Sequence, residues 1–283
     1  MCWTVRPDSA LRGLCYPKGV VELSGLESDA QRLERVLLSL PELELRVNWL
    51  LDQFERWSTS TIAARLDELC ARSEASVPAA REAMLAVACC FVAQGESELV
   101  RELRGLADTG CLLSLARLLP NAPRSGTSPP PAMTDVPDYG TGRELTVGER
   151  RTLARRPSRA QIDRLLADPH PLVIRELLLN TKLTENDVLR LVARRPARVA
   201  ALEAVARSTY WLCRPRVRFA MVQNPGTPPW IAGPLLVLCN RRELTEVVGN
   251  TSVALGLRST AQELLVLRPP LANVSTSSQD VLQ

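Results

Sequence analysis

The sequence predicts an all-α protein whose C-terminal half consists of short, stacked helices. Hydrophobic residues make up 46% of the 283-residue chain but aromatic residues only 4%, so the core must be aliphatic. Leucine and alanine dominate the apolar residues, and both favour helices, whereas β-branched runs are rare. Apolar residues also recur at intervals of three and four positions, which is the spacing of one helix face.

Residues 1–119 are expected to form a helical N-terminal domain. Prolines and glycines interrupt its first 23 or so residues, which should therefore be irregular. The segment 83–93 contains no charged residue and should form the most buried helix of this half. Hydroxyl caps and a first-turn proline predict four helix starts, at Ser28 with Gln31, at Ser60, at Pro78 and at Ser97.

Residues 120–142 are predicted to be a flexible linker between two domains. The segment is rich in proline, serine and glycine and can bury little apolar surface against the entropy of ordering it. The three consecutive prolines at 129–131 leave open the alternative of a peptide-recognition ligand. The polar residues 269–283 are expected to be a flexible tail.

Residues 143–268 are predicted to be a helical repeat domain. An apolar helix face followed by Arg-Arg-Pro occurs at 153–157 and again at 192–196, a spacing of 39 residues (196 − 157), close to the roughly 40 residues of paired-helix repeats. Helices this short cannot each bury a face alone and must stack. Asparagine tolerates the left-handed conformation at a helix end. We therefore expect a helix to end at an asparagine and the next helix to start at the following hydroxyl residue, in three places: Asn180 with Thr184, Asn224 with Thr227 and Asn250 with Ser252. Capping boxes predict two further helix starts, at Thr146 and Ser158.

The turns between these helices resemble those of HEAT-like repeats, especially of the leucine-rich repeat variant. The resemblance covers about residues 145–265 and is carried by Leu166-Ala167-Asp168-Pro169, Leu179-Asn180-Thr181-Lys182-Leu183-Thr184 and Val222-Gln223-Asn224-Pro225-Gly226-Thr227-Pro228. It implies a HEAT-like α-solenoid. One member of the variant family carries an iron–sulfur cluster on clustered N-terminal cysteines. That clustering is missing here, so no cofactor is expected.

Charge is distributed unevenly along the chain. Residues 1–143 carry 15 basic and 19 acidic side chains, a net charge of −4, whereas residues 144–283 carry 20 and 12, a net charge of +8. A GC-rich genome explains the preference for arginine over lysine. The candidate partner-binding residues are seven arginines that lie in pairs or alternate: Arg155, Arg156, Arg194, Arg195, Arg214, Arg216 and Arg218.

Three interpretations of these arginines remain open. Cations at a helix C-terminus complement the helix dipole, so the Arg-Arg-Pro phrases can be purely structural. If stacking aligns them, they form a basic ridge that contacts phosphates or an acidic protein surface. The acidic N-terminal half and the basic C-terminal half can also dock on each other. Aromatic residues for base stacking are scarce in this half, where Tyr210, Trp211 and Trp230 are the candidates.

No pattern in the sequence indicates catalysis. The single histidine, His170, lies between two prolines in a turn, and Asp168 is expected to accept nearby backbone amides. No Cys-x-x-Cys pair is present, and most of the eight cysteines lie in apolar helical segments, where they act as small core residues. No catalytic residue, metal site or cofactor is expected, nor a signal peptide or membrane span, so a cytoplasmic protein is predicted.

Together these observations predict a non-catalytic helical-repeat adaptor that binds a protein partner. The alternative is binding to the phosphate backbone of a nucleic acid through Arg155, Arg156, Arg194 and Arg195. No residue supports a hydrolase or a DNA-modifying enzyme, and the oligomeric state is left open.

Overall fold

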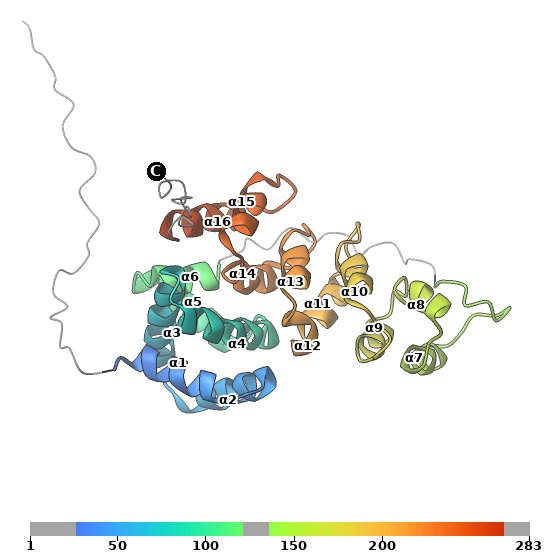
Figure 1. The fold of residues 1–283 in the computed structure, drawn as a ribbon, viewed down its shortest axis with the longest axis horizontal. Coiled ribbons are helices and arrows are strands. Elements are labelled where there is room, and N and C mark those ends of the chain that lie inside the picture. Colours follow the sequence, from blue (N-terminus) through green and yellow to red (C-terminus); the bar gives the residue numbers. More distant parts are fainter. Residues whose placement is uncertain (1–26, 121–135, 269–283) are drawn as a thin grey trace, which may run out of the picture.

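The computed structural model describes residues 27–120 and 136–268, and there the fold is all-α, as predicted. Those residues form sixteen helices and no strand (Figure 1). None of these helices combines the length and the apolar character needed to cross a bilayer. The predictions for the irregular first 23 residues, for the prolines at 129–131 and for the tail at 269–283 lie outside the described residues.

The described N-terminal part is a bundle around one central helix. The capping box at Ser28 is confirmed, and so are the starts at Pro78 and Ser97. The third helix is capped by Ser58 rather than Ser60, because the Ser58 hydroxyl accepts the N–H of Thr61. Helix α4 packs against α1, α2 and α3 and is the most buried helix of this half, as the uncharged segment 83–93 predicts. The helices are α1 (Asp29–Ser39), α2 (Leu43–Arg56), α3 (Thr59–Glu74), α4 (Pro78–Gln94), α5 (Glu98–Thr109) and α6 (Leu113–Leu118).

The C-terminal part consists of shorter helices, and five of its ten helices have eight residues, about two turns. The predicted capping boxes at Thr146 and Ser158 are present, and the predicted start at Thr184 is confirmed and is also a capping box. Two expected starts are wrong: Thr227 precedes the cap residue Pro228, and the last helix begins at Leu255 rather than Ser252. The helices are α7 (Val147–Arg155), α8 (Arg159–Leu165), α9 (Pro171–Leu178), α10 (Glu185–Val192), α11 (Val199–Ala206), α12 (Thr209–Leu212), α13 (Pro215–Val222), α14 (Pro229–Leu236), α15 (Arg241–Gly249) and α16 (Leu255–Leu267).

These helices form two rows (Figure 1). In the lower row of the view, α7 packs against α9 and α9 against α11, with α12 following. In the upper row lie α8, α10, α13 and α14, in which α10 packs against α13 and α13 against α14. The chain crosses from one row to the other after nearly every helix, so each helix buries its apolar face against both rows.

Polar contacts between neighbours within a row show the register of the stack. Arg151 bonds to Glu176, 25 residues ahead, and Asn224 bonds to the carbonyl of Val192, 32 residues behind. The two Arg-Arg-Pro phrases are 39 residues apart and end α7 and α10, which lie in different rows. The predicted equivalence of these phrases is therefore wrong, because they are three helices apart and an odd number of crossings places them in opposite rows.

Asparagine ends helices in this stack by hydrogen bonding across it. The side-chain amide of Asn180 donates to the carbonyl of Arg155 at 2.8 Å, and that of Asn224 donates to the carbonyl of Val192 at 2.5 Å. Each side-chain oxygen accepts an amide two residues ahead, from Lys182 and Gly226. Neither asparagine has a positive φ, so the expected left-handed conformation is wrong. Asparagine is suited to this position because one side chain supplies both a donor and an acceptor.

Replacing Asn224 with alanine should lower the free energy of unfolding by about 1–3 kcal/mol, because the buried carbonyl of Val192 loses its donor. Urea denaturation of the full chain measures this change. The matched control is Asn186→Ala, which removes an exposed asparagine from the adjacent helix α10 and should change the stability by less than about 0.5 kcal/mol. Equal effects of the two substitutions would contradict the structural role of Asn224.

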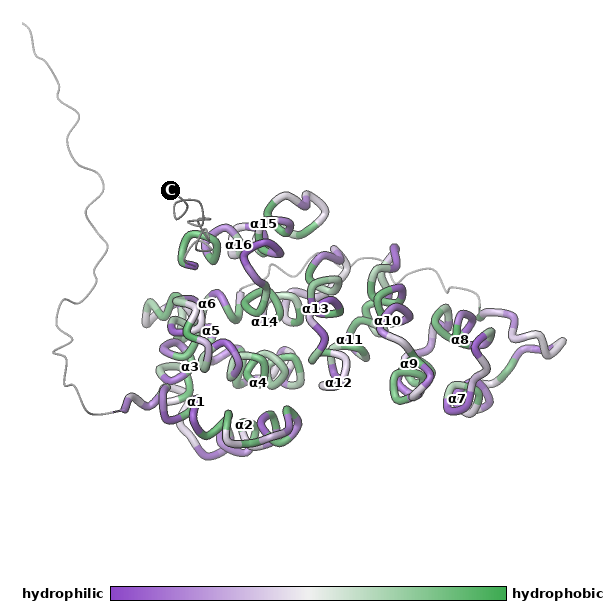
Figure 2. Tube along the Cα trace, viewed as in Figure 1, coloured by the Kyte–Doolittle hydropathy of each residue, from purple (hydrophilic) through white to green (hydrophobic). Residues whose placement is uncertain are grey.

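The N-terminal bundle packs directly on the C-terminal rows. Helix α4 contacts both α11 and α14, and hydrophobic residues cover α4 and α14 (Figure 2). Gly233 of α14 lies against Pro120, where an added Cβ would come within 2.5 Å of the proline ring, so only glycine fits. The two parts expected to be joined by a linker thus share one apolar interface in the described structure.

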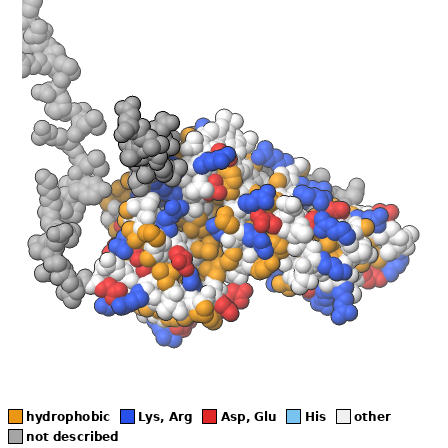
Figure 3. Space-filling model, in the orientation of Figure 1, with side chains coloured by type: hydrophobic (Ala, Val, Ile, Leu, Met, Phe, Trp, Pro, Cys, Tyr) orange, Lys and Arg blue, Asp and Glu red, His pale blue; other side chains and the backbone are white. Residues whose placement is uncertain are grey.

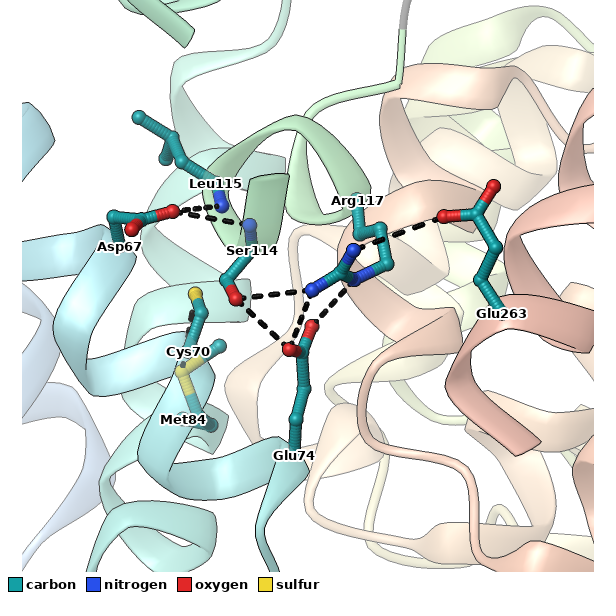
Figure 4. Close-up of polar contacts among 8 residues, drawn as sticks. All are labelled: Asp67, Cys70, Glu74, Met84, Ser114, Leu115, Arg117 and Glu263. Carbon is teal, nitrogen blue, oxygen red and sulfur yellow. Dashed lines mark hydrogen bonds and ion pairs between the residues drawn. The ribbon is translucent and has the colours of Figure 1, made fainter. Parts of the chain in front are cut away.

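A polar network reinforces this junction (Figure 4). Glu74 of α3 accepts two hydrogen bonds from the Arg117 guanidinium, at 2.7 and 2.6 Å, and one from Ser114 at 2.8 Å. Asp67 of α3 accepts the backbone amides at the start of α6. Arg117 also lies 3.7 Å from Glu263 of α16, so one guanidinium joins the bundle to the last C-terminal helix.

Replacing Arg117 with alanine should destabilise the protein by about 3–5 kcal/mol, because the nearly buried carboxylate of Glu74 loses its cation. Thermal and urea unfolding measure this effect. Arg56→Ala provides the control, since it breaks an exposed pair with Asp52 that should contribute at most about 1 kcal/mol. A small effect of Arg117→Ala would show that Glu74 is solvated rather than held by this pair.

Candidate partner-binding surface

The turns between the two rows form two edges of the stack. The connections that lead from the lower row to the upper row, at 155–158, 179–185 and 207–216, define the first edge and are called its turns, although the last includes the four-residue helix α12. The turns that lead back, at 166–170 and 193–198, and the turn at 223–228, which joins α13 to α14 within the upper row, define the second edge. Cross-turn hydrogen bonds show that neighbours lie side by side. They are Asn180 to the carbonyl of Arg155 and the Trp211 indole N–H to the carbonyl of Leu178 on the first edge, and Asn224 to the carbonyl of Arg194 on the second.

The seven candidate arginines divide between these edges. Arg194 and Arg195 lie on the second edge, and Arg218 lies within α13, half-buried, where it donates to the carbonyl of Leu212 at 2.5 Å. Burial lowers the pKa of Arg218. The structure therefore brings four of the seven onto one edge and separates the other three; the four on the first edge are Arg155, Arg156, Arg214 and Arg216.

On the second edge the arginines complement carbonyl groups at the ends of neighbouring helices. Arg198 donates to the carbonyls of Ala167 and Asp168, the latter at 2.8 Å. Arg194 reaches the carbonyl of Leu166 and Arg195 that of Gln223, each at 3.4 Å. This favours the structural interpretation of these arginines, although they cap adjacent helices and not their own. The two 3.4 Å contacts are long, and both side chains remain exposed.

The first edge carries ion pairs that leave part of its positive charge unopposed. Arg155 and Arg151 both donate to Glu176, which lowers the pKa of that carboxyl to about 2. Arg214 donates to the Tyr210 hydroxyl at 2.9 Å and lies 3.3 Å from Glu185. The described structure gives no carboxylate partner to Arg156 or to Lys182, the lysine of the same edge.

Two large apolar side chains are exposed on the first edge and were missed by the sequence analysis. Leu179 is 79% exposed and Tyr210 is 61% exposed. A signal for both exists in the sequence. Leu179 is the third leucine in a row, and a helix cannot direct three consecutive side chains into one core. Tyr210 directly precedes Trp211, which is buried, so the two aromatic rings must point in different directions.

A buried polar cluster lies where α7 meets the turn after α8. Asp168 is fully buried, and one of its oxygens accepts both Arg150 and the Tyr139 hydroxyl at 2.6 Å. Its other oxygen accepts the amide of His170, as expected from the turn. Tyr139 belongs to the segment predicted as a flexible linker, yet its side chain is 7% exposed. No periodicity predicts this contact, because it joins an irregular segment to a turn.

The remaining candidates for chemistry have structural contacts. His170 is the cap of α9, where its Nδ1 accepts the amide of Leu172. Four cysteines in the described residues are buried in the core, as predicted, and burial raises the pKa of Cys89 and Cys239 to about 12. Thiols with such pKa values are weak nucleophiles at neutral pH. The described residues contain no group of three histidine, cysteine or acidic side chains arranged to hold a metal ion.

Comparison of the chain with protein-family models, with curated proteins and with solved structures found no match. The likeness to HEAT-like repeats therefore remains one of short turn motifs.

The pairing of Glu176 predicts how stability depends on acid. Because its folded-state pKa is lowered to about 2, the stabilisation is complete above the ordinary pKa of glutamate, about 4.3, and is lost as the pH falls through about 2. Glu176→Gln should therefore flatten the loss of stability between those values, as measured by urea unfolding at a series of pH values. Glu246→Gln, on an exposed pair with Arg242, should leave the slope unchanged. An unchanged slope for Glu176→Gln would exclude this pairing.

Proposed function

We propose that the protein is a non-catalytic adaptor whose C-terminal helices form a HEAT-like α-solenoid that binds a protein partner. The two rows of helices and the recurring turn contacts support the repeat architecture. Contacts between neighbouring units join residues that are 25 to 33 positions apart in the sequence. This spacing indicates a repeat length shorter than the roughly 40–47 residues of HEAT repeats. Two-turn helices explain the shorter step and are consistent with the turns that resemble the leucine-rich repeat variant.

The observation that carries the proposal is the concentration of unpaired cations on the C-terminal helices. Among residues 27–120, one exposed basic side chain, Arg81, lacks a carboxylate partner in the described structure. Figure 3 shows basic side chains gathered over the end of the molecule that carries α7 to α10. Six exposed basic residues in 136–268 lack a carboxylate partner among the described residues: Arg156, Arg164, Arg175, Lys182, Arg194 and Arg195. A surface of this kind favours an acidic partner.

The aromatic residues favour a protein partner over a nucleic acid. Trp211 is 1% exposed, and Trp230 is half-buried against the junction with the N-terminal bundle. The Arg214 guanidinium lies 5.1 Å from the centre of the Tyr210 ring, and that ring meets Trp211 in a T-shaped contact. Tyr210 is thus the one substantially exposed ring of the three, whereas base binding along a strand uses several stacking rings.

Affinity capture from a lysate of the source cells, followed by mass spectrometry, tests this function. Arg156, Arg194 and Arg195 would be changed together to glutamate, and Arg81→Glu would serve as the matched charge reversal outside the C-terminal helices. We expect proteins that bind wild type and the control but are lost from the triple variant. The triple variant should fold. Arg194 and Arg195 make only long contacts with carbonyl groups, and Arg156 makes no hydrogen bond or ion pair that the described structure shows. A thermal melt checks that the variant is folded.

Duplex and single-stranded DNA titrations at several salt concentrations test the alternative. The adaptor proposal expects no affinity beyond the non-specific range of about 10⁻⁴–10⁻⁶ M at physiological salt. Nanomolar binding that weakens steeply with salt would show that the basic surface binds phosphates. The same protein set captured by wild type and the triple variant would exclude the C-terminal cations as the binding surface.

A further inference from the structure

The first edge is a continuous surface in which three consecutive turns contact one another. The turn at 179–185 touches the end of α7 through Asn180 and through Lys182, whose ammonium group donates to the carbonyl of Pro157 at 3.3 Å. The same turn touches the segment 207–216 through Trp211. Packed helices lie about 8–10 Å apart, so three turns span about 20 Å, the length of about six extended residues.

The middle of this surface is apolar. Leu179 follows Leu178, whose carbonyl accepts the Trp211 indole, and Tyr210 packs with a ring-centroid distance of 4.9 Å against Trp211. Trp211 therefore links the segments that carry Leu179 and Tyr210, which are the large exposed apolar side chains of this edge. Neither side chain is needed to fill the core, so their exposure is available for a partner.

The surroundings of the apolar pair are basic. The three turns contain six cations and one carboxylate, and two further carboxylates just outside them, Glu176 and Glu203, pair with Arg155 and Arg207. The net charge is +3 (6 − 3): Arg155, Arg156, Lys182, Arg207, Arg214 and Arg216 against Glu176, Glu185 and Glu203. The second edge contains three arginines and Asp168, which is buried. The charge and the exposed apolar residues thus coincide on the first edge and not on the second.

We infer that the first edge binds an acidic segment of a partner protein that places a large apolar side chain against Leu179 and Tyr210. This inference rests on the proposed adaptor function and names the chemistry of the partner. Carboxylates flanking the apolar side chain pair with Arg156 and Lys182, which have no carboxylate partner in the described structure. An apolar contact at the centre and ion pairs at the rim are the usual arrangement of a specific protein interface.

A phage-display selection of random peptides of about twelve residues against the full chain tests the inference. That length exceeds the roughly six extended residues that the edge spans. Peptides enriched on wild type should be acidic and carry at least one leucine, isoleucine, phenylalanine or tryptophan. Synthetic copies of these peptides would then be titrated by fluorescence polarisation against wild type and against variants.

Two variants and two controls separate the apolar contribution to peptide binding from the electrostatic contribution. Leu179→Ser removes the apolar contact, and Arg156→Glu with Lys182→Glu reverses the rim. Each should weaken binding by at least about ten-fold, the effect of losing one buried leucine contact or two ion pairs. Leu113→Ser, on another exposed leucine (61% exposed, in α6), and Arg81→Glu should bind the peptides as wild type does. Thermal melts confirm that each variant is folded.

Each other outcome overturns the inference. A selection that enriches nothing, or that enriches neutral or basic peptides, excludes an acidic occupant. Acidic peptides that bind Leu179→Ser as tightly as wild type show a purely electrostatic surface. DNA that competes with the peptides and depends on Arg156 and Lys182 but not on Leu179 assigns the edge to nucleic acid. If the peptides fail while the lysate still yields partners that depend on Arg194 and Arg195, the adaptor function stands and its surface is the second edge.

Discussion

The C-terminal half depends on hydrogen bonds to the ends of very short helices. An α-helix leaves its last four carbonyls without an intrahelical partner, so in a helix of eight residues half of the carbonyls need another donor. Stacking places a side-chain donor from the neighbouring helix at many of these ends. The donors include Asn180, Asn224, the Trp211 indole and the guanidinium groups of Arg198, Arg241 and Arg268. Short helices therefore need donors from their stacked neighbours, and arginine side chains supply several of these donors.

This requirement also changes how the positive charge is understood. Several arginines of the C-terminal half are structural donors, and Arg268 is the extreme case, since it is 4% exposed and donates to the carbonyls of Val237 and Cys239. Burial lowers its pKa to about 10. Six exposed cations among residues 136–268 have no carboxylate partner in the described structure, and they lie on turns and on helices α8 and α9.

The ends of the stack are covered by other parts of the described chain. At one end, α4 of the N-terminal bundle packs on α11 and α14, and the Arg117 network joins the bundle to α16. At the other end, Tyr139 inserts beside Arg150 and Asp168. A helical stack with an exposed apolar end would associate with further copies of itself, and this covering removes that tendency at both ends.

The sequence by itself determined the helical class, the buried helix α4 and six helix starts, because caps, prolines and apolar periodicity act within a few residues. It also indicated that short helices must stack. The tertiary structure alone decided which helices are neighbours, and therefore that the two Arg-Arg-Pro phrases lie in different rows. It placed Leu179 and Tyr210 on one edge and paired Tyr139 with Asp168. The physical reason is that these contacts join residues some 25 to 33 positions apart or more, whose pairing depends on how whole helices cross, and local patterns carry no information about crossing.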